Sequence, residues 1–167
     1  GGGGGSDYTV DKTTIEASEL NTLDGNYSGT VDASIVTQII GSVSAVNTAY
    51  ASSGITGLGN ESVTLTDTTV SATSLNTLDA NTTGAINAAT VTTLTGTVAE
   101  INTVYAANIA GTISGLGNEA VTISDTTIDA ALLMTLDTFT SGLINASSIT
   151  TLTGSDADKA TVRASSG

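Results

Sequence analysis

The sequence predicts an α/β solenoid of tandem strand–helix repeats with one parallel sheet. The chain of 167 residues contains three copies of one stretch, in which Leu23, Leu78 and Leu136 are equivalent at spacings of 55 and 58 residues. Each copy contains an apolar template that begins with strand spacing and ends with helical spacing. A second motif with helical spacing follows at regular intervals. Self-similarity at a fixed period is the signature of a repeat architecture.

The repeats also predict how the chain is divided. Residues 1–7, which begin GGGGGS, have the composition of a flexible linker. Residues 8–167 form a single tandem-repeat domain, with units of about 8–61, 62–119 and 120–167. The third copy is truncated, so we expect the chain to be a fragment of a longer array.

The apolar template is Φ-x-A-x-x-Φ-x-x-Φ, where Φ is an aliphatic residue. Its first step of two residues is the spacing of a strand, and its later steps of three are helical or 3₁₀ spacing. Each template therefore predicts a strand end that turns into a helical segment. The six copies begin at Ile15, Val31, Val70, Ile86, Ile128 and Ile144.

The motif Φ-N-T-Φ marks the expected helices. It occurs at residues 20–23, 46–49, 75–78 and 101–104, and Thr97 with Glu100 forms a capping box before the last of these. Strands are expected between the helices, and a strand–helix–strand order implies parallel pairing with right-handed crossovers. The expected strands are Tyr8–Asp11, Thr30–Ala33, Ser62–Thr66, Ala85–Ala88, Ala120–Ser124 and Leu143–Ala146.

A second architecture fits the same pattern. In a right-handed β-solenoid the Φ-x-x-Φ segments would be corners rather than helices. Frequent Thr and Asn residues lower the helix propensity and favour this alternative, whereas the capping signals favour helices. The sequence leaves both open.

Composition restricts the classes of partner. The net charge is −13, and the three basic residues are Lys12, Lys159 and Arg163. A chain without a basic patch cannot neutralise phosphates, so neither nucleic acid nor an anionic membrane surface is expected as a partner. No apolar run reaches the roughly 18 residues that span a bilayer, so no membrane insertion is expected.

The residue types needed for catalysis are also few. The chain contains no histidine and no cysteine, which removes the commonest acid–base and nucleophilic groups. The carboxylate pairs Glu16 with Glu19 and Asp156 with Asp158 fit solvated first turns of helices better than an acid–base pair. We therefore expect no enzymatic activity, no catalytic residue and no cofactor-binding residue.

Calcium is the one metal ion that the sequence suggests. Asp24 with Asn26, and Asp79 with Asn81, follow equivalent predicted helices and have a glycine shortly after them. Oxygen ligands at alternate positions followed by glycine are typical of calcium loops, although the full spacing of an EF-hand is absent. These four residues are weak candidates for a calcium site, and turn formation is the competing interpretation.

The repeats resemble those of very large secreted or cell-surface proteins of marine unicellular cyanobacteria. The likeness rests on LNTLDxNxxG, VTTLTG and NTxYAxxxxxxGLGNE and covers about residues 8–167. Similar repeats occur in tail-fibre-like proteins of phages. The resemblance implies an extracellular or cell-surface location, with roles in surface coats, attachment or swimming motility.

These observations predict a structural segment of an extended extracellular or cell-surface protein. It would act as a spacer, a coat component or an adhesin stalk, and its partners would be copies of itself or neighbouring repeats of the same array. Two alternatives remain: a module that binds a glycan or calcium, and a component of a phage fibre.

Overall fold

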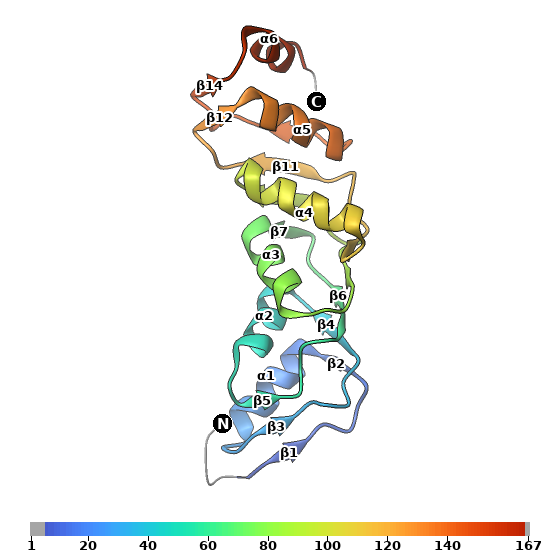
Figure 1. Cartoon of the computed structure of the whole chain (residues 1–167). Coiled ribbons are helices and arrows are strands. Elements are labelled where there is room, and N and C mark those ends of the chain that lie inside the picture. Colours follow the sequence, from blue (N-terminus) through green and yellow to red (C-terminus); the bar gives the residue numbers. More distant parts are fainter. Residues whose placement is uncertain (1–5, 166–167) are drawn as a thin grey trace.

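The computed structural model describes residues 6–165, so residues 1–5 of the predicted linker and the last two residues lie outside it. The chain is elongated, with the N-terminal and C-terminal coils at opposite ends (Figure 1). We call each run of two or three strands followed by one helix a coil, and residues 6–165 contain six of them.

The coils contain the following elements. Coils 1 and 2 contain β1 (Tyr8–Thr9), β2 (Thr14–Glu16) and α1 (Ala17–Asn26), then β3 (Val31–Asp32), β4 (Gln38–Gly41) and α2 (Val43–Ala51). Coils 3 and 4 contain β5 (Ile55–Thr56), β6 (Ser62–Leu65), β7 (Thr69–Ser71) and α3 (Ala72–Asn81), then β8 (Ile86–Asn87), β9 (Thr93–Gly96) and α4 (Val98–Ala110). Coils 5 and 6 contain β10 (Ile113–Ser114), β11 (Ala120–Ile123), β12 (Thr127–Asp129) and α5 (Ala130–Phe139), then β13 (Ile144–Asn145), β14 (Thr151–Thr153) and α6 (Asp156–Ala164).

The prediction of an α/β repeat is confirmed, and the β-solenoid alternative is wrong. All strand pairs in residues 6–165 are parallel, and strand segments alternate with six helices in a solenoid-like layout. Every Φ-N-T-Φ motif lies in a helix, from α1 to α4. The helices stack on one another along the length of the molecule (Figure 1).

The prediction of one parallel sheet is wrong, because the described strands form four. Their orders are β1-β3-β5, β10-β8-β6-β4-β2, β13-β11-β9-β7 and β12-β14. Pairing joins successive coils, so that Ile15 lies beside Ile39, and Ile39 beside Val63. Each strand has only two to four residues, and glycines with positive φ, such as Gly57 and Gly115, turn the chain between strands of one coil. Neighbouring strands of a coil therefore belong to different sheets.

Coils 3 and 5 contain a third strand, and this strand shifts the pairing. In coil 2 the second strand, β4, pairs with the second strand of coil 3, β6. In coil 4 it is the first strand, β8, that pairs with β6, while β9 pairs with the extra strand β7. As a result, the strands that lead into α1 and α2 belong to one sheet, those that lead into α3 and α4 to a second, and those that lead into α5 and α6 to a third.

The apolar template folds in two ways, and only half of its copies were predicted correctly. The copies beginning at Ile15, Val70 and Ile128 pass from a strand into a helix, as expected. The copies beginning at Val31, Ile86 and Ile144 pass instead through a turn into a second strand.

The difference between the two kinds of copy has a physical cause in the residues after the alanine. In the strand–turn–strand copies these residues are rich in β-branched types, as in Thr90–Thr93, and such residues are poor helix formers. The turn is closed by side chains such as Asn87, whose Oδ1 accepts a hydrogen bond from the Ala89 amide at 3.0 Å.

The six predicted strands exist, each shorter than expected. They correspond to β1, β3, β6, β8, β11 and β13. The strands β2, β7 and β12 were expected only as the strand ends of the apolar template. The sequence did not predict the other strands that lead into helices, β4, β9 and β14, or the strands β5 and β10 that lead into the Gly-Leu-Gly-Asn turns.

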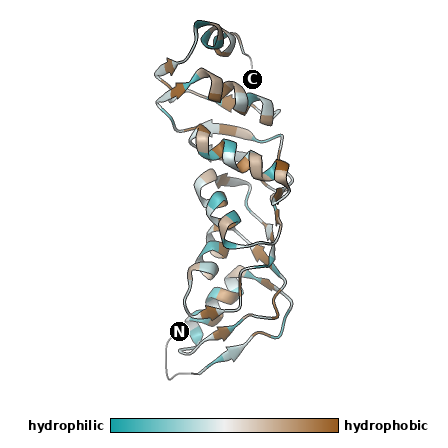
Figure 2. Cartoon of the chain, viewed as in Figure 1, coloured by the Kyte–Doolittle hydropathy of each residue, from teal (hydrophilic) through white to brown (hydrophobic). Residues whose placement is uncertain are grey.

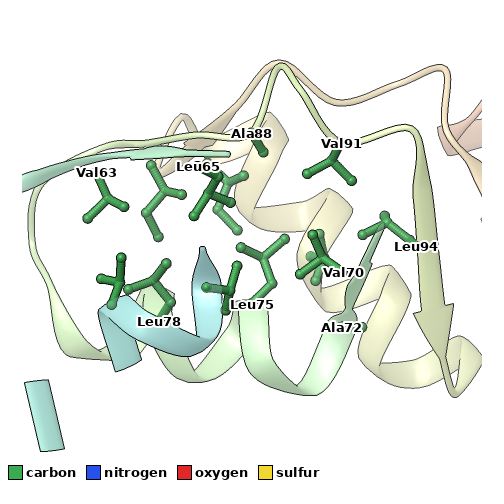
Figure 3. Packing of buried hydrophobic residues seen from close by; sticks show 14 of the residues in the cluster. Val63, Leu65, Val70, Ala72, Leu75, Leu78, Ala88, Val91 and Leu94 are labelled. Atoms are coloured by element: carbon green, nitrogen blue, oxygen red, sulfur yellow. The ribbon is translucent and has the colours of Figure 1, made fainter. Parts of the chain in front are cut away.

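The core runs through the interior of coils 1 to 5, and half-buried apolar residues of coil 6 pack against it. Val63 and Leu65 of β6 face Leu75 and Leu78 of α3, and Leu94 of β9 closes the same layer (Figure 3). These side chains are 0–1% exposed. Hydrophobic and hydrophilic residues are interspersed along most helices and strands (Figure 2), and the buried residues are almost all apolar. Most core residues are aliphatic, as the low aromatic content of 3% requires.

Candidate functional site

The candidate calcium residues lie at the ends of two helices that α2 separates. Asp24 and Asn26 end α1, and Asp79 and Asn81 end α3. Asp24 accepts a hydrogen bond from Ser52 Oγ at 2.6 Å. Residues 6–165 contain no group of three or more acidic residues placed to hold a metal ion. The calcium site stays a prediction.

Two of the other three members of this set also bond to neighbouring coils. Asp79 accepts a hydrogen bond from Thr112 Oγ1 at 3.4 Å, and Asn81 Nδ2 donates to Asn47 Oδ1 at 3.3 Å. With Asp24, three of the four candidates thus link one coil to another. This arrangement explains their recurrence without a ligand.

The asparagines of the Φ-N-T-Φ motif form a ladder along the helix stack. Each side-chain amide donates to a backbone carbonyl of the next helix. The bonds run from Asn21 to Ala45 at 3.0 Å, from Asn47 to Ser74 at 3.0 Å, from Asn76 to Glu100 at 3.1 Å and from Asn102 to Leu132 at 3.5 Å. The ladder stops at α5, where Met134 occupies the asparagine position and cannot donate.

The threonine of the same motif has a different role. Its hydroxyl donates to the carbonyl four residues earlier in its own helix, as from Thr77 to Thr73 at 3.0 Å and from Thr103 to Ala99 at 3.0 Å. This local bond satisfies an exposed hydroxyl within the helix. The motif thus combines one bond between coils with one bond inside a helix.

Two aspartates cap helices of the preceding coil. Asp67 Oδ2 accepts from the Val43 amide at the start of α2, and Asp125 Oδ2 accepts from the Val98 amide at the start of α4, both at 2.8 Å. The first amides of a helix have no partner within it, and the helix dipole favours a negative charge there. Each of these helices is therefore capped by its own Ser42 or Thr97 and by the next coil.

Two glutamates are fully buried beside tyrosines. Glu61 and Glu119, which end the Gly-Leu-Gly-Asn turns, are 0% exposed. Glu119 Oε1 accepts from the Tyr105 hydroxyl at 2.9 Å and from the Gly117 amide at 2.8 Å. Glu61 makes the same bonds with Tyr50 and Gly59, both at 2.8 Å. Burial raises the pKa of both tyrosines well above its ordinary value.

The second oxygen of each carboxyl group is buried without a hydrogen-bond partner among the described residues. Thr82 and Thr140 reinforce the two turns, since their hydroxyls donate to the Glu61 and Glu119 carbonyls at 2.6 Å. Both clusters tie a turn to the helix of its own repeat unit and to the following coil. Their bonds are structural, and they are closed to solvent.

A cavity lies at the C-terminal end, between α5 and α6. It has a volume of about 420 Å³ and is lined mainly by aliphatic side chains, including Leu133, Ile144 and Val162. Coil 6 leaves its interior partly open, because Ile144 and Leu152 are half-buried whereas the equivalent Ile86 and Leu94 are 0% exposed.

Helix α6 also differs from the helices that it repeats. Ser155 caps α6 as Thr97 caps α4, so Asp156, Lys159 and Arg163 occupy the places of Val98, Ile101 and Tyr105. Those three residues of α4 are 0–1% exposed. Charged residues thus replace core residues in α6, where Asp156 and Arg163 are exposed and Lys159 is half-buried.

The sequence did not identify the aspartate caps, the buried glutamates or the charged face of α6. A comparison of equivalent positions in the three copies nevertheless shows residue exchanges that point to these features. Asp67 and Asp125 align with Lys12, and Tyr50 and Tyr105 align with Arg163. Such exchanges at aligned positions mark where the first and last coils depart from the interior ones.

No helix within residues 6–165 is both long enough and apolar enough to cross a membrane. Comparisons of the chain with protein-family models, with curated proteins and with solved structures give no significant match.

Proposed function

We propose that this chain is a structural segment of an extended extracellular or cell-surface protein. Its role would be that of a spacer, a coat component or a stalk, and a phage fibre would use the same mechanical properties. One observation carries the proposal: the residues with chemically useful side chains form bonds between coils. The asparagine ladder, the aspartate caps and the glutamate–tyrosine pairs all hold one coil against the next.

Such an arrangement suits a rod. Each coil contacts only its neighbours, so length is added without changing the cross-section, and stability is approximately a sum over coils and their interfaces. Extracellular placement is supported by the resemblance to surface repeats and by the absence of basic residues between Lys12 and Lys159, which leaves this span without sites for trypsin-like proteases.

The calcium and glycan alternatives have less support. Three of the four candidate calcium residues make bonds between coils, as described above, and these bonds favour a structural role for them. No specific contact geometry favours a glycan.

Small-angle X-ray scattering tests whether the chain is a rod. A compact domain of this size has a radius of gyration of about 15 Å, and we expect a clearly larger value with a constant cross-section. Insertion of a second copy of residues 62–119 should lengthen the particle by a fixed increment. A compact particle, or an insertion that widens it, would contradict the proposal.

Force spectroscopy tests its mechanical role. We expect the chain, pulled from its ends, to resist until coils unfold, with a total gain in length on the order of 500 Å, since an extended residue spans about 3.3–3.6 Å. Smooth extension without force peaks would argue against a load-bearing role.

A further inference from the structure

We propose that the two buried glutamates, Glu61 and Glu119, each bind one internal water molecule through the carboxyl oxygen Oε2. Glu61 lies in coil 3, between β5 and β6, and Glu119 lies in coil 5, between β10 and β11. Both of these coils have a neighbouring coil on each side, and both side chains are 0% exposed. The inference goes beyond the proposed function, because such a site would exist whether or not the chain acts as a spacer.

One oxygen atom in each carboxyl group carries the proposal. Oε1 of Glu61 accepts hydrogen bonds from the Tyr50 hydroxyl and the Gly59 amide, whereas Oε2 is buried and has no partner among the described residues. The two oxygens of Glu119 are divided in the same way. A buried acceptor that has lost its contact with water and gained no donor destabilises the fold, and the effect is larger for a carboxylate. Each Oε2 therefore needs a hydrogen-bond donor.

The side chains of the protein do not supply this donor. Between Lys12 and Lys159 the sequence contains no lysine, arginine or histidine. The nearby donors are already used, since the Thr82 hydroxyl donates to the Glu61 carbonyl at 2.6 Å and the Gly84 amide donates to that hydroxyl at 3.1 Å. The donor for Oε2 is thus expected to come from the solvent.

A pair of hydroxyl groups beside each carboxyl group provides further partners for a water molecule. The Tyr50 hydroxyl, which donates to Glu61, also lies within hydrogen-bonding distance of Thr82. Tyr105 and Thr140 have the same relationship in the other cluster. An internal water typically makes about three hydrogen bonds to buried polar groups. A water that donates to Oε2 can therefore also bond to the neighbouring hydroxyl groups.

The glycine that holds each carboxyl group leaves room for a small molecule. The amides of Gly59 and Gly117 both donate to the glutamate two residues later, at 2.8 Å. A Cβ added to either glycine would meet no atom within 4 Å. The turn therefore brings the backbone to the carboxyl group without filling the adjacent space with a side chain.

A metal ion suits these clusters less well than water does. Calcium takes about six to eight oxygen ligands, and residues 6–165 contain no group of three or more acidic residues placed to hold a metal ion. Each cluster contributes a single carboxyl group, of which one oxygen already accepts two hydrogen bonds. Water needs only about two to four polar partners, which the cluster can supply.

The two clusters have the same geometry although the loops that build them differ in length. Tyr50 precedes Glu61 by 11 residues, whereas Tyr105 precedes Glu119 by 14. The tyrosine–glutamate bonds nevertheless measure 2.8 and 2.9 Å, and the threonine hydroxyl lies 2.6 Å from the glutamate carbonyl in both clusters. Because the insertion leaves these contacts unchanged, we expect both clusters to bind water in the same way.

A crystal structure of the unchanged chain, at a resolution that orders internal waters, tests the proposal directly. We expect one water molecule at about 2.8 Å from Oε2 of Glu61 and another at the same distance from Oε2 of Glu119. A structure without a water at either oxygen would overturn the proposal. A metal ion at these places, identified by its anomalous scattering, would overturn it as well.

Magnetic relaxation dispersion of the solvent, which counts waters held longer than the protein takes to tumble, provides the test in solution. Glu61→Met removes both carboxyl oxygens in a side chain of similar length, so the count should fall by one. Glu61→Gln keeps polar atoms at both places and should leave the count unchanged, and Glu119 is the internal reference in both variants. An equal count in Glu61→Met and the unchanged chain would contradict the proposal. Circular dichroism establishes that each variant is folded, and if Glu61→Met does not fold, the crystal structure of the unchanged chain still decides.

Discussion

The hydroxyl of Tyr105 donates a hydrogen bond to Oε1 of Glu119 across 2.9 Å, and both residues are at most 1% exposed. The same bond joins Tyr50 to Glu61 one repeat earlier. A buried carboxyl group in a span without basic residues is held only by hydrogen-bond donors. This relationship makes the Gly-Leu-Gly-Asn-Glu turn a fixed part of the fold, although its composition is that of an exposed loop.

Substitution of Glu61 tests the importance of those donors. Glu61→Ala leaves the Gly59 amide and the Tyr50 hydroxyl without their acceptor, at a cost of about 1–3 kcal/mol each. Glu61→Gln keeps a carbonyl oxygen for both donors and should change the free energy of unfolding by less than about 1 kcal/mol. Urea denaturation measures both, and equal losses for the two variants would show that the acceptor oxygen is unimportant.

The asparagine ladder predicts opposite effects at two equivalent positions. Asn76→Ala removes the bond to the Glu100 carbonyl and should cost about 0.5–1.5 kcal/mol. Met134→Asn restores the missing donor in α5 and should stabilise the α5–α6 contact by a similar amount. Hydrogen exchange of the α6 amides reports the second effect locally. Faster exchange in Met134→Asn would contradict the ladder.

Two glycines predict opposite responses to the same substitution. A Cβ at Gly84 would lie 2.1 Å from the Glu61 carbonyl oxygen, so Gly84→Ala should destabilise the fold by about 1–3 kcal/mol or more. A Cβ at Gly25 would meet nothing within 4 Å, and Gly25→Ala in α1 should stabilise it by about 0.5–1 kcal/mol. Thermal unfolding of the pair provides the comparison, and a stable Gly84→Ala chain would refute the close approach of the two coils.

Stability should fall in acid. Hydrogen bonds from Thr73 and Thr97 lower the pKa of Glu100, and bonds from Ser34 lower the pKa of Asp32. A carboxyl group with a lower pKa in the folded chain stabilises it at pH values above the unfolded pKa of about 4, and this contribution is lost as the pH falls through the folded pKa.

The acid effect is measured as the unfolding midpoint between about pH 6 and pH 2. The Glu100→Gln and Asp32→Asn variants lack the titrating group, so their midpoints should vary less with pH than that of the unchanged chain. A pH dependence that is identical in the variants would show that these two carboxylates do not contribute.

Much of the fold could be predicted because the repeat reports the same pattern several times. The Φ-N-T-Φ motif identified helices at Leu20 and Leu75 despite low helix propensity, since stacking rather than propensity stabilises them. The helices that the template predicted after Val31 and Ile86 were wrong, because apolar spacing alone does not distinguish a helix from two strands joined by a turn. The β-branched residues after Ala33 and Ala88 contained that information.

The bonds between coils were harder to predict than the elements. Asp67 caps a helix that begins 24 residues earlier, and nothing in its local sequence indicates that partner. Glu61 follows an Asn in a glycine-rich turn, where a carboxylate is ordinarily solvated. In both cases the partner is fixed by the stacking distance between coils, which only the folded chain defines.

The strand added in every second coil has a consequence for how such proteins change in length. Replication slippage that adds or removes one coil would place a two-strand coil where a three-strand coil is needed. The strands and the helices would then no longer repeat with the same period. The addition or removal of two coils keeps the alternation of two-strand and three-strand coils. Natural variation in length should therefore occur in steps of about one full repeat, with half-steps removed by selection.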